Sequence, residues 1–294
     1  MATRLDTREK GFDAAFKALL ETKREAQADV DEAVRKILAD VRAHGDEAVI
    51  ALTREFDGFE LTPETMAVAA DAIEDAKAQV DQDVLAALEL AARRIADFHR
   101  RQIPDGLDFT DEAGLRLGIR WTPVAAVGLY VPGGTAAYPS SVLMNALPAK
   151  IAGVERLAMV VPAPKGVVTP LVLAAASIAG VDEVYRVGGA QAIGALAFGT
   201  KTIAAVDKIV GPGNAYVAAA KRQVFGTVGI DMIAGPSEIL VLADGLNDPA
   251  WIAADLLAQA EHDASSQAIL ITDDPAFADA VSGAIESHLK TLPR

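Results

Sequence analysis

The chain has 294 residues, a formal net charge of −14 and 51% hydrophobic residues, and these figures limit the classes of protein to which it can belong. The length fits about two domains with sizeable cores. A nucleic-acid-binding face needs clustered Lys and Arg, whereas this acidic chain has only short basic pairs such as Arg93-Arg94 and Lys221-Arg222. We interpret those pairs as solvated helix faces. The absence of cysteine excludes disulfides, Cys-ligated zinc and a Cys nucleophile in this chain.

Neither the start of the chain nor its apolar runs indicate targeting or membrane insertion. Residues 1–6 contain no apolar signal core. The longest weakly polar run, residues 166–181, contains Pro170, and it is shorter than the roughly 20 residues that a spanning helix needs. We therefore expect a soluble, cytoplasmic protein without membrane or nucleic-acid partners.

The N-terminal third of the sequence predicts helices. Apolar residues at 12–20 share one face of a short N-terminal helix, and those at 30–41 recur at helical spacing up to Gly45, a C-cap residue. Further helices are expected at 46–56 and 84–102.

From residue 115 onward the pattern changes to strands that alternate with helices. Residues 115–121 alternate like a strand. The buried strands that follow are predicted at 124–130, 156–161, 183–187 and 204–210, each leading through a turn into a helix. After residue 236 the same alternation gives strands at 238–243 and 267–272 and helices at 249–262 and 275–289. Repeated strand–turn–helix units predict a parallel, doubly wound sheet.

The fold class predicted is α/β, with two Rossmann-like parallel-sheet domains that lack the G-x-G-x-x-G fingerprint and an N-terminal helical segment. The units after residue 237 need further strands, either from the N-terminal part or from residues outside this chain. The expected organisation is therefore a helical arm at 1–25, a discontinuous first domain at 26–121 plus 237–294, and a second domain at 122–236. The chain stops directly after a helix, so the first domain is expected to be incomplete.

Two glycine turns lie where strands pass into helices, at Gly188-Gly189-Ala190-Gln191 and at Gly211-Pro212-Gly213-Asn214. Glycines at a helix N-terminus let backbone N–H groups approach a phosphate. The third glycine of the dinucleotide fingerprint is replaced by Tyr216, and Pro212 removes a donor. Tight β–α turns, with Asn214 as a helix N-cap, explain the pattern as well as a nucleotide site does.

A third motif is Gly235-Pro236-Ser237-Glu238. It lacks the G-x-S-x-G context of a hydrolase nucleophile and has no neighbouring His. A hydroxyl that hydrogen-bonds a ligand is the favoured interpretation of Ser237, and a simple turn is the alternative.

The helix predicted at 249–262 carries Gln259 and His262 three residues apart on one face. Both side chains can reach one metal ion, although a His at a helix C-terminus is also a common structural feature. A zinc site wants about three protein ligands, so these two would need partners from elsewhere. His288 is interpreted as a solvated residue of the last helix.

Five motifs in this order resemble those of the histidinol dehydrogenase family. They are GLYVPGG at 128–134, VGGAQA at 187–192, KIVGPGN at 208–214, IDMIAGPSE at 230–238 and QAEH at 259–262. The resemblance extends over nearly the whole chain and is strongest between residues 128 and 262.

The resemblance implies a zinc-dependent, NAD-linked homodimer that oxidises L-histidinol through the aldehyde to L-histidine. By carry-over, Tyr130, Gln191 and Asn214 contact NAD, Ser237 contacts substrate, and Gln259 and His262 bind zinc and lie against substrate. The family's Glu-His pair, which activates water and acts as general base, has no counterpart in this chain, because it lies beyond residue 294 together with the remaining zinc ligands. That missing part also helps to build the partner's site, so we expect this chain alone to show little activity and weak zinc binding.

Two other functions remain compatible with the sequence. One is a dehydrogenase of the same superfamily that acts on another polyol, such as a sulfonated propanediol. The other is a non-catalytic nucleotide-binding or assembly module.

Overall fold

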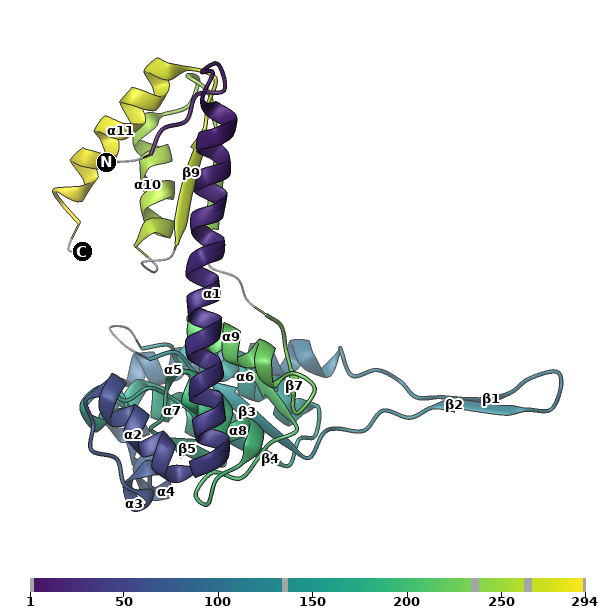
Figure 1. Cartoon of the computed structure of the whole chain (residues 1–294). Helices are drawn as coiled ribbons and strands as arrows, with labels where there is room; N and C mark the ends of the chain where they lie inside the picture. The colour runs from purple at the N-terminus through teal and green to yellow at the C-terminus, as the bar shows by residue number, and fades with distance from the viewer. Residues whose placement is uncertain (1–2, 134–136, 234–237, 262–265, 293–294) are drawn as a thin grey trace. The chain divides into compact units, whose positions relative to one another are not determined.

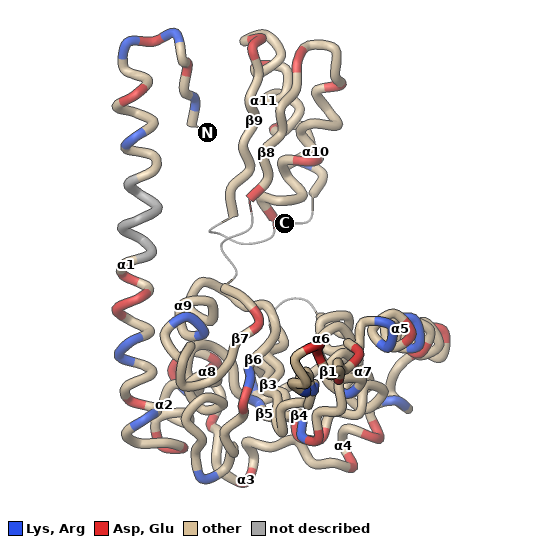
Figure 2. The backbone as a smooth tube through the Cα atoms, turned by 90° about the vertical axis from the view of Figure 1, so that its right-hand side faces the viewer, with Lys and Arg blue, Asp and Glu red and all other residues tan. Residues whose placement is uncertain are grey.

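The computed structural model describes residues 3–133, 137–233, 238–261 and 266–292, with the backbone alone for residues 21–27. The chain divides into two compact units, residues 1–26 with 235–294 (unit 1) and residues 27–234 (unit 2). Helix α1 (Phe12–His44) is one continuous helix (Figure 1), in which Lys and Arg alternate with Asp and Glu (Figure 2). The prediction of a separate short helix at 12–20 was wrong, because neither Gly nor Pro interrupts the helix-forming residues that follow it.

Unit 2 contains a five-stranded sheet in which every neighbouring pair is parallel. Its strands are β3 (Ala126–Tyr130), β4 (Arg156–Val160), β5 (Glu183–Tyr185), β6 (Lys208–Val210) and β7 (Gly229–Ile230), in the order β5-β4-β3-β6-β7. The predicted parallel α/β fold is therefore confirmed.

Helices connect these strands in the predicted alternation. They are α6 (Pro139–Ile151), α7 (Pro170–Ala179), α8 (Gly189–Phe198) and α9 (Ala215–Val224), with a short 3-10 turn, η2 (Pro164–Gly166), before α7. A proline occupies the first turn of both α6 and α7, where its missing N–H is not needed.

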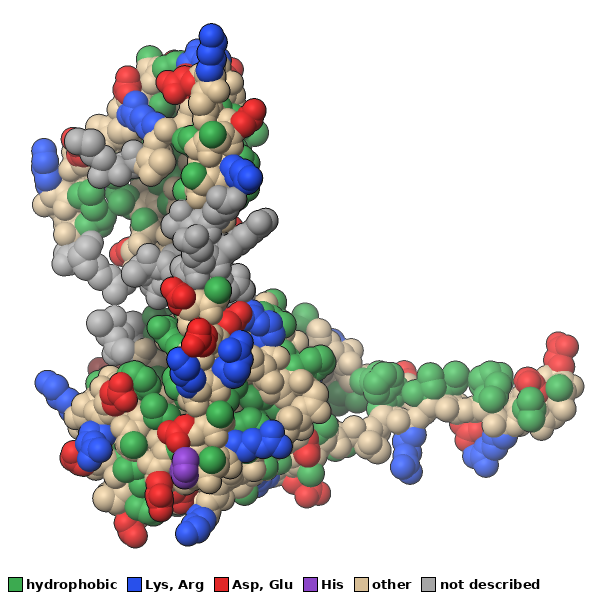
Figure 3. Space-filling model, viewed as in Figure 1, with side chains coloured by type: hydrophobic (Ala, Val, Ile, Leu, Met, Phe, Trp, Pro, Cys, Tyr) green, Lys and Arg blue, Asp and Glu red, His purple; other side chains and the backbone are tan. Residues whose placement is uncertain are grey.

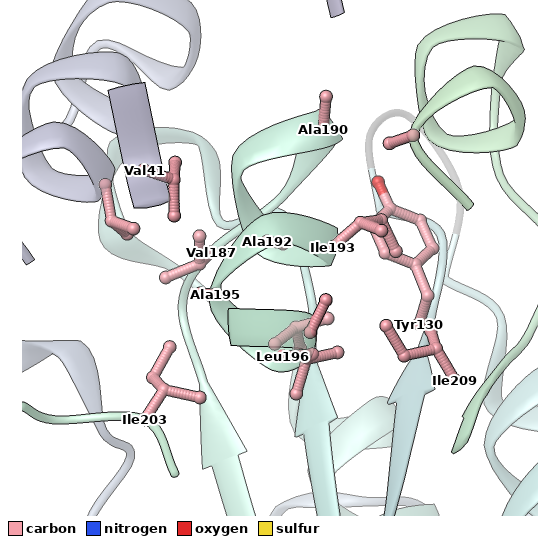
Figure 4. Packing of buried hydrophobic residues seen from close by; sticks show 14 of the residues in the cluster. Val41, Tyr130, Val187, Ala190, Ala192, Ile193, Ala195, Leu196, Ile203 and Ile209 are labelled. Atoms are coloured by element: carbon pink, nitrogen blue, oxygen red, sulfur yellow. The ribbon is translucent and has the colours of Figure 1, made fainter. Parts of the chain in front are cut away.

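Apolar side chains cover both faces of this sheet. Side chains of a strand point alternately to its two sides, so residues of one strand belong to two different clusters. Ala126 and Tyr130 of β3 belong to one buried cluster with residues of α8 and α9, part of which Figure 4 shows. Val127 and Leu129 belong to a second cluster with residues of α6 and α7. A strand buried on both faces needs the near-continuous apolar sequence that predicted it.

Besides α1, the helices before residue 101 contribute further residues to the two buried clusters of unit 2. They are α2 (Asp46–Asp57), α3 (Pro63–Met66), α4 (Ala70–Asp75), η1 (Ala76–Gln79) and α5 (Gln82–Arg100). Leu38 and Val41 of α1 lie so close to Gly194 of α8 that an added Cβ would meet them at 3.1 and 3.2 Å. The observed division differs from the predicted grouping of 26–121 with 237–294, and that grouping stays a prediction.

A two-stranded antiparallel hairpin extends from unit 2 (Figure 1). Its strands are β1 (Leu107–Thr110) and β2 (Arg116–Ile119), and every residue of both is exposed. The strand predicted at 115–121 is present as β2, whereas β1 was not predicted.

Unit 1 contains a two-stranded parallel sheet, β8 (Glu238–Leu242) and β9 (Gln267–Ile271), with α10 (Pro249–Ala260) and α11 (Pro275–Leu289). Ile239 and Val241 pack against a small core contributed by both helices. Asp248 and Asp274 cap the two helices by accepting the N–H groups of Ala250 and Ala276.

The described residues include no helix that is both long enough and apolar enough to cross a membrane.

Candidate functional site

The order of the strands in unit 2 identifies one edge of the sheet as the candidate site. After β3 the chain builds β4 and β5 on one side, then returns to build β6 and β7 on the other. Ligands of open α/β sheets bind outside the carboxyl ends of the strands at the place where the order reverses. Here that place lies between β3, which ends at Tyr130, and β6, which leads into Gly211.

The backbone of Gly211 lies directly against Tyr130. Gly211 has φ 116°, and a Cβ added to it would lie 2.1 Å from the carbonyl oxygen of Tyr130. Only glycine fits this conformation and this close approach. The turn at 211–214 is therefore shaped by its contact with the end of β3.

The Tyr130 side chain reaches the other glycine turn. Tyr130 is buried beside Ile193 (Figure 4), and its hydroxyl accepts a hydrogen bond from the Gly189 N–H at 3.2 Å. Burial, with a smaller contribution from the negative charge of Asp57, raises the pKa of Tyr130 to about 12, although the Gly189 N–H opposes the shift. The phenol is thus neutral at physiological pH and retains its proton for donation to a ligand.

Gln191 brings a buried acceptor to the first turn of α8. The residue is 1% exposed, and its Oε1 has no hydrogen-bond partner among the residues that the structure describes. A Cβ added to Gly189 would lie 2.6 Å from this oxygen. A buried carbonyl without a donor costs about 1–3 kcal/mol, so a ligand that supplies an N–H or O–H would relieve that cost.

Asn214 is the N-cap of α9, as one of the two interpretations of the sequence required. Its Oδ1 accepts the Val217 N–H at 3.1 Å, and the residue is exposed. The amide nitrogen makes no hydrogen bond within the described part of the chain. The cap uses the acceptor of Asn214 and leaves its donor for another role.

The structure therefore gathers the cofactor-binding candidates at one edge. Tyr130 contacts Gly189 through its hydroxyl and Gly211 through its carbonyl. Gln191 and Asn214 follow these glycines at the N-termini of α8 and α9.

Lys221 and Asp231 were not singled out from the sequence, yet they lie at the same edge. Lys221 of α9 is 3% exposed and pairs with Asp231, which follows β7. The interpretation of Lys221-Arg222 as a solvated helix face was wrong, because Arg222 also pairs with a residue of α1, Asp31. A signal existed for Lys221, since its position is four residues after the buried Val217 and three before the buried Val224.

Asp57 is a second residue that the sequence analysis missed. It is the last residue of α2, its Oδ2 is buried without a hydrogen-bond partner among the described residues, and burial raises the pKa of its carboxyl. A carboxylate at a helix C-terminus opposes the helix dipole, and that unfavourable position was the available signal. The negative charge of Asp57 also contributes to the raised pKa of Tyr130.

The candidate metal residues are only partly described. Ser237 and His262 lie outside the described residues. Gln259 is half-buried on α10, and its Nε2 donates to Ser266 Oγ at 3.5 Å. No group of three or more His, Asp or Glu that could hold a metal occurs among the described residues. One amide oxygen does not make a zinc site by itself.

His288 is not the freely solvated residue that its position predicted. Its ring is half-buried, and Nε2 lies 3.2 Å from the backbone oxygen of Ala250. The imidazole thus joins α11 to the start of α10 within unit 1.

A parallel sheet of this order, with glycine turns and polar side chains at its reversal point, defines the class of α/β dinucleotide-binding proteins. The family model for histidinol dehydrogenase matches residues 20–294, and the chain belongs to this family. Members are NAD-dependent oxidoreductases that act on a small-molecule substrate in histidine biosynthesis.

Individual relatives support the same assignment. The chain is 65% identical to histidinol dehydrogenase of Rhodospirillum rubrum and 64% identical to that of Rhizobium meliloti, in both cases over all of this chain and 68% of the relative. The crystal structure of histidinol dehydrogenase from Elizabethkingia anophelis is similar with a TM-score of 0.75 and 39% identity, over 89% of this chain and 60% of that one. The chain thus spans about two thirds of the length of the curated relatives that it matches.

Proposed function

We propose that the protein to which this chain belongs oxidises L-histidinol to L-histidine through L-histidinal, in the last steps of histidine biosynthesis. Each oxidation removes one hydride, which NAD accepts, and one proton, so two NAD are reduced. One water molecule enters at the aldehyde level and supplies the second carboxyl oxygen. The observation that carries the proposal is the family match over residues 20–294. The candidate site at the carboxyl ends of β3 and β6, where the strand order reverses, supports it.

NAD binds in this proposal across the carboxyl ends of β3 and β6. Tyr130 would donate a hydrogen bond to the cofactor through its phenolic O–H, Gln191 Oε1 would accept one from it, and the Asn214 amide would donate one to it. The support is geometric: Gln191 has a buried acceptor without a described partner, and Asn214 has a donor that its cap does not use. The N-termini of α8 and α9 at this edge favour the negative phosphates.

The substitution Asn214→Asp tests this arrangement. Asn214→Asp keeps an oxygen to cap α9 but replaces the amide donor with an acceptor. We expect it to leave the melting temperature near that of the wild type and to weaken NAD binding on the order of tenfold, the effect of one lost hydrogen bond to a charged or polar ligand. Unchanged NAD affinity in Asn214→Asp would remove Asn214 from the cofactor site.

Substrate and zinc are assigned to Ser237, Gln259 and His262 on the family resemblance. When bound, zinc would hold the imidazole and amine of L-histidinol and so orient the carbinol carbon. Metal analysis of the purified protein tests the assignment, with His262→Ala as the variant and His288→Ala as its control. Equal zinc content in the wild type and His262→Ala would count against the site.

The direct test of the function is NADH formation by the whole protein with L-histidinol. We expect two NADH per L-histidinol consumed and L-histidine as the product. A panel containing other polyols and a sulfonated propanediol accompanies it, and faster turnover of one of those would assign the protein a different substrate.

We also propose a cytoplasmic homodimer, and the hairpin supports the assembly. In its register Leu107 lies opposite Ile119 and Phe109 opposite Leu117, so these four exposed residues share one face. The hairpin carries a row of apolar side chains (Figure 3), and exposed apolar surfaces of this kind mark protein–protein contacts.

Substitution on the two faces of the hairpin tests its part in the dimer. Leu117→Asp changes the apolar face, and Thr110→Asp is the matched control because Thr110 pairs with Arg116 on the other face. Sedimentation should show a monomer for the first variant and a dimer for the second. A dimer in both would exclude the hairpin from the interface.

A further inference from the structure

Lys221 is the one cationic side chain among the buried residues that the structure describes. It projects from α9, seven residues after the N-cap Asn214. Placing an ammonium group in a protein interior costs several kcal/mol unless a counter-charge and hydrogen bonds compensate it. The groups that compensate the Lys221 charge are Asp231 and the carbonyl of Gly211, and they indicate its structural role.

Lys221 and Asp231 together hold both polar groups of a single residue, Gly211. Lys221 Nζ donates to the Gly211 carbonyl oxygen at 2.9 Å. Asp231 Oδ2 accepts the Gly211 N–H at 2.8 Å, while Asp231 Oδ1 pairs with Lys221 and accepts the Met232 N–H at 2.6 Å. One ion pair therefore fixes the orientation of the peptide groups on both sides of Gly211.

Gly211 is also confined from the opposite side. Its α-carbon lies against the Tyr130 carbonyl, as the 2.1 Å approach of an added Cβ records, and its φ of 116° is open to few residues other than glycine. The peptide is thus held between the end of β3 and the Lys221–Asp231 pair. The direction in which the chain leaves Gly211 determines where Asn214 and the N-terminus of α9 point.

Stability alone does not account for charges at this position, because apolar residues of similar volume often replace a buried ion pair at no loss. A turn that had only to connect β6 to α9 would need neither group. The pair instead supplies what apolar residues cannot, namely directional hydrogen bonds to the N–H and the carbonyl of Gly211, which belong to the two peptide groups that flank this residue.

We propose that Lys221 and Asp231 are positioning residues of the cofactor site, which hold the Gly211–Asn214 turn in the conformation that binds NAD. The inference rests on the proposed function, since it takes this turn to hold the cofactor. Neither side chain touches the reacting atoms. Their loss therefore raises the KM for NAD and leaves the KM for L-histidinol and the pH profile of kcat unchanged.

The test replaces the pair with apolar side chains in the whole protein. Lys221→Met leaves Asp231 without its counter-charge and lowers the melting temperature. The double variant Lys221→Met/Asp231→Leu removes both charges and regains much of that loss. We expect the double variant to bind NAD on the order of tenfold more weakly than the wild type, even where its melting temperature is restored. Asp231→Asn keeps an acceptor for the Gly211 N–H and should weaken NAD binding less than the double variant does.

Another ion pair of the same sheet provides the matched control. Lys150 pairs with Asp182 at 2.9 Å, and Asp182 Oδ2 accepts the Leu157 N–H at 2.8 Å. This pair also holds a backbone N–H, but beside the amino ends of β4 and β5, away from the carboxyl edge. Lys150→Met/Asp182→Leu should leave the NAD dissociation constant at the wild-type value.

Two measurements separate failure of this inference from failure of the proposed function. If the wild type neither binds NAD nor oxidises L-histidinol, the proposed function is wrong. Hydrogen exchange of the backbone amides of Gly211, Gly213 and Asn214 without ligand then still tests whether the Lys221–Asp231 pair holds the turn. Exchange should be faster in Lys221→Met/Asp231→Leu and unchanged in the control. Wild-type NAD affinity in a folded double variant, or unchanged exchange there, would overturn the inference.

Discussion

The two units contain parallel sheets built from the same strand–helix alternation, but the sheets differ in how their faces are covered. In unit 2 all five residues of β3 are buried, and separate apolar clusters lie on its two sides. In unit 1 the residues of β8 alternate between exposed and half-buried, with Leu240 and Leu242 at 59% and 76% exposure. The face of β8–β9 that carries Ile239 and Val241 packs on α10 and α11.

This difference shows what completes a parallel sheet. Parallel strands are normally covered on both faces, and unit 2 achieves this with helices from both halves of its sequence. The exposed face of the β8–β9 sheet instead carries four apolar side chains, Leu240, Leu242, Ile269 and Ile271. Unit 2 thus has a reversal of strand order at the carboxyl ends of β3 and β6, whereas the two-stranded sheet of unit 1 has one incompletely covered face.

The largest expected effect comes from truncating matched leucines in the two sheets. Leu129 of β3 is fully buried, whereas Leu240 of β8 is 59% exposed. Leu129→Ala should lower the free energy of unfolding by about 3 to 5 kcal/mol, because it removes buried contacts and leaves a cavity, and Leu240→Ala by less than about 1 kcal/mol. Urea unfolding followed by circular dichroism measures both. Equal losses would mean that the two strands are equally buried in solution.

Gly211→Ala should have the next largest effect, about 2 to 4 kcal/mol, because it combines an unfavourable φ with overlap against the Tyr130 carbonyl. Gly226→Ala is the control, since Gly226 has φ +100° but no neighbour from the described part of the chain within 4 Å of an added Cβ. The difference between the two losses in free energy of unfolding isolates the effect of the close approach of Gly211 to the Tyr130 carbonyl. If they lose the same stability, the approach of Gly211 to Tyr130 is not restrictive.

The stability of unit 2 should also depend on alkaline pH, because all four tyrosines of the chain lie there, at positions 130, 138, 185 and 216. The pKa of buried Tyr130 is raised from 10.0 to about 12. The unfolded chain therefore loses this proton first as pH rises, so the contribution is complete below pH 10 and is lost up to pH 12, by about 2 to 3 kcal/mol. Tyr130→Phe should flatten the decline, and a wild-type slope in that variant would contradict the assignment. Tyr185, whose pKa is also raised to about 12, accounts for slope that remains.

The smallest effect is expected in unit 1 and has the opposite sign. Gly283 lies inside α11, and no atom of the described residues lies within 4 Å of an added Cβ. Gly283→Ala should therefore raise the free energy of unfolding by about 0.5 to 1 kcal/mol through helix propensity alone. A melting temperature below that of the wild type would indicate that this helix face is packed against something.

The sequence predicted the alternation of strands and helices because local signals mark each boundary. Prolines begin α6, α7, α10 and α11, and glycines at 188–189 and 211 mark the turns after β5 and β6. It also predicted that Asn214 could be a cap. Strand β1 was missed because its alternation covers only the four residues Leu107–Thr110, whereas the alternation that predicted β2 covers seven, at 115–121.

The positioning groups of the candidate site were harder to recognise. Lys221 is adjacent to Arg222 and Gln223, and that local composition resembles a surface helix. Its partners, Gly211 and Asp231, each lie ten residues away in sequence and meet it only when α9 folds back beside β6 and β7. The effect of the Asp57 charge on the pKa of Tyr130 acts across a still longer separation in sequence, from α2 to the end of β3. Such contacts follow from the strand order, which no local pattern specifies.

The hairpin β1–β2 has a consequence for how the stability of this protein should be measured. Its two strands are joined by a short turn, so it can form early and with little loss of chain entropy. The apolar face that it then presents is buried only by association in the proposed homodimer. Association adds to stability by mass action, and the melting temperature should accordingly rise with protein concentration, a dependence that Leu117→Asp abolishes.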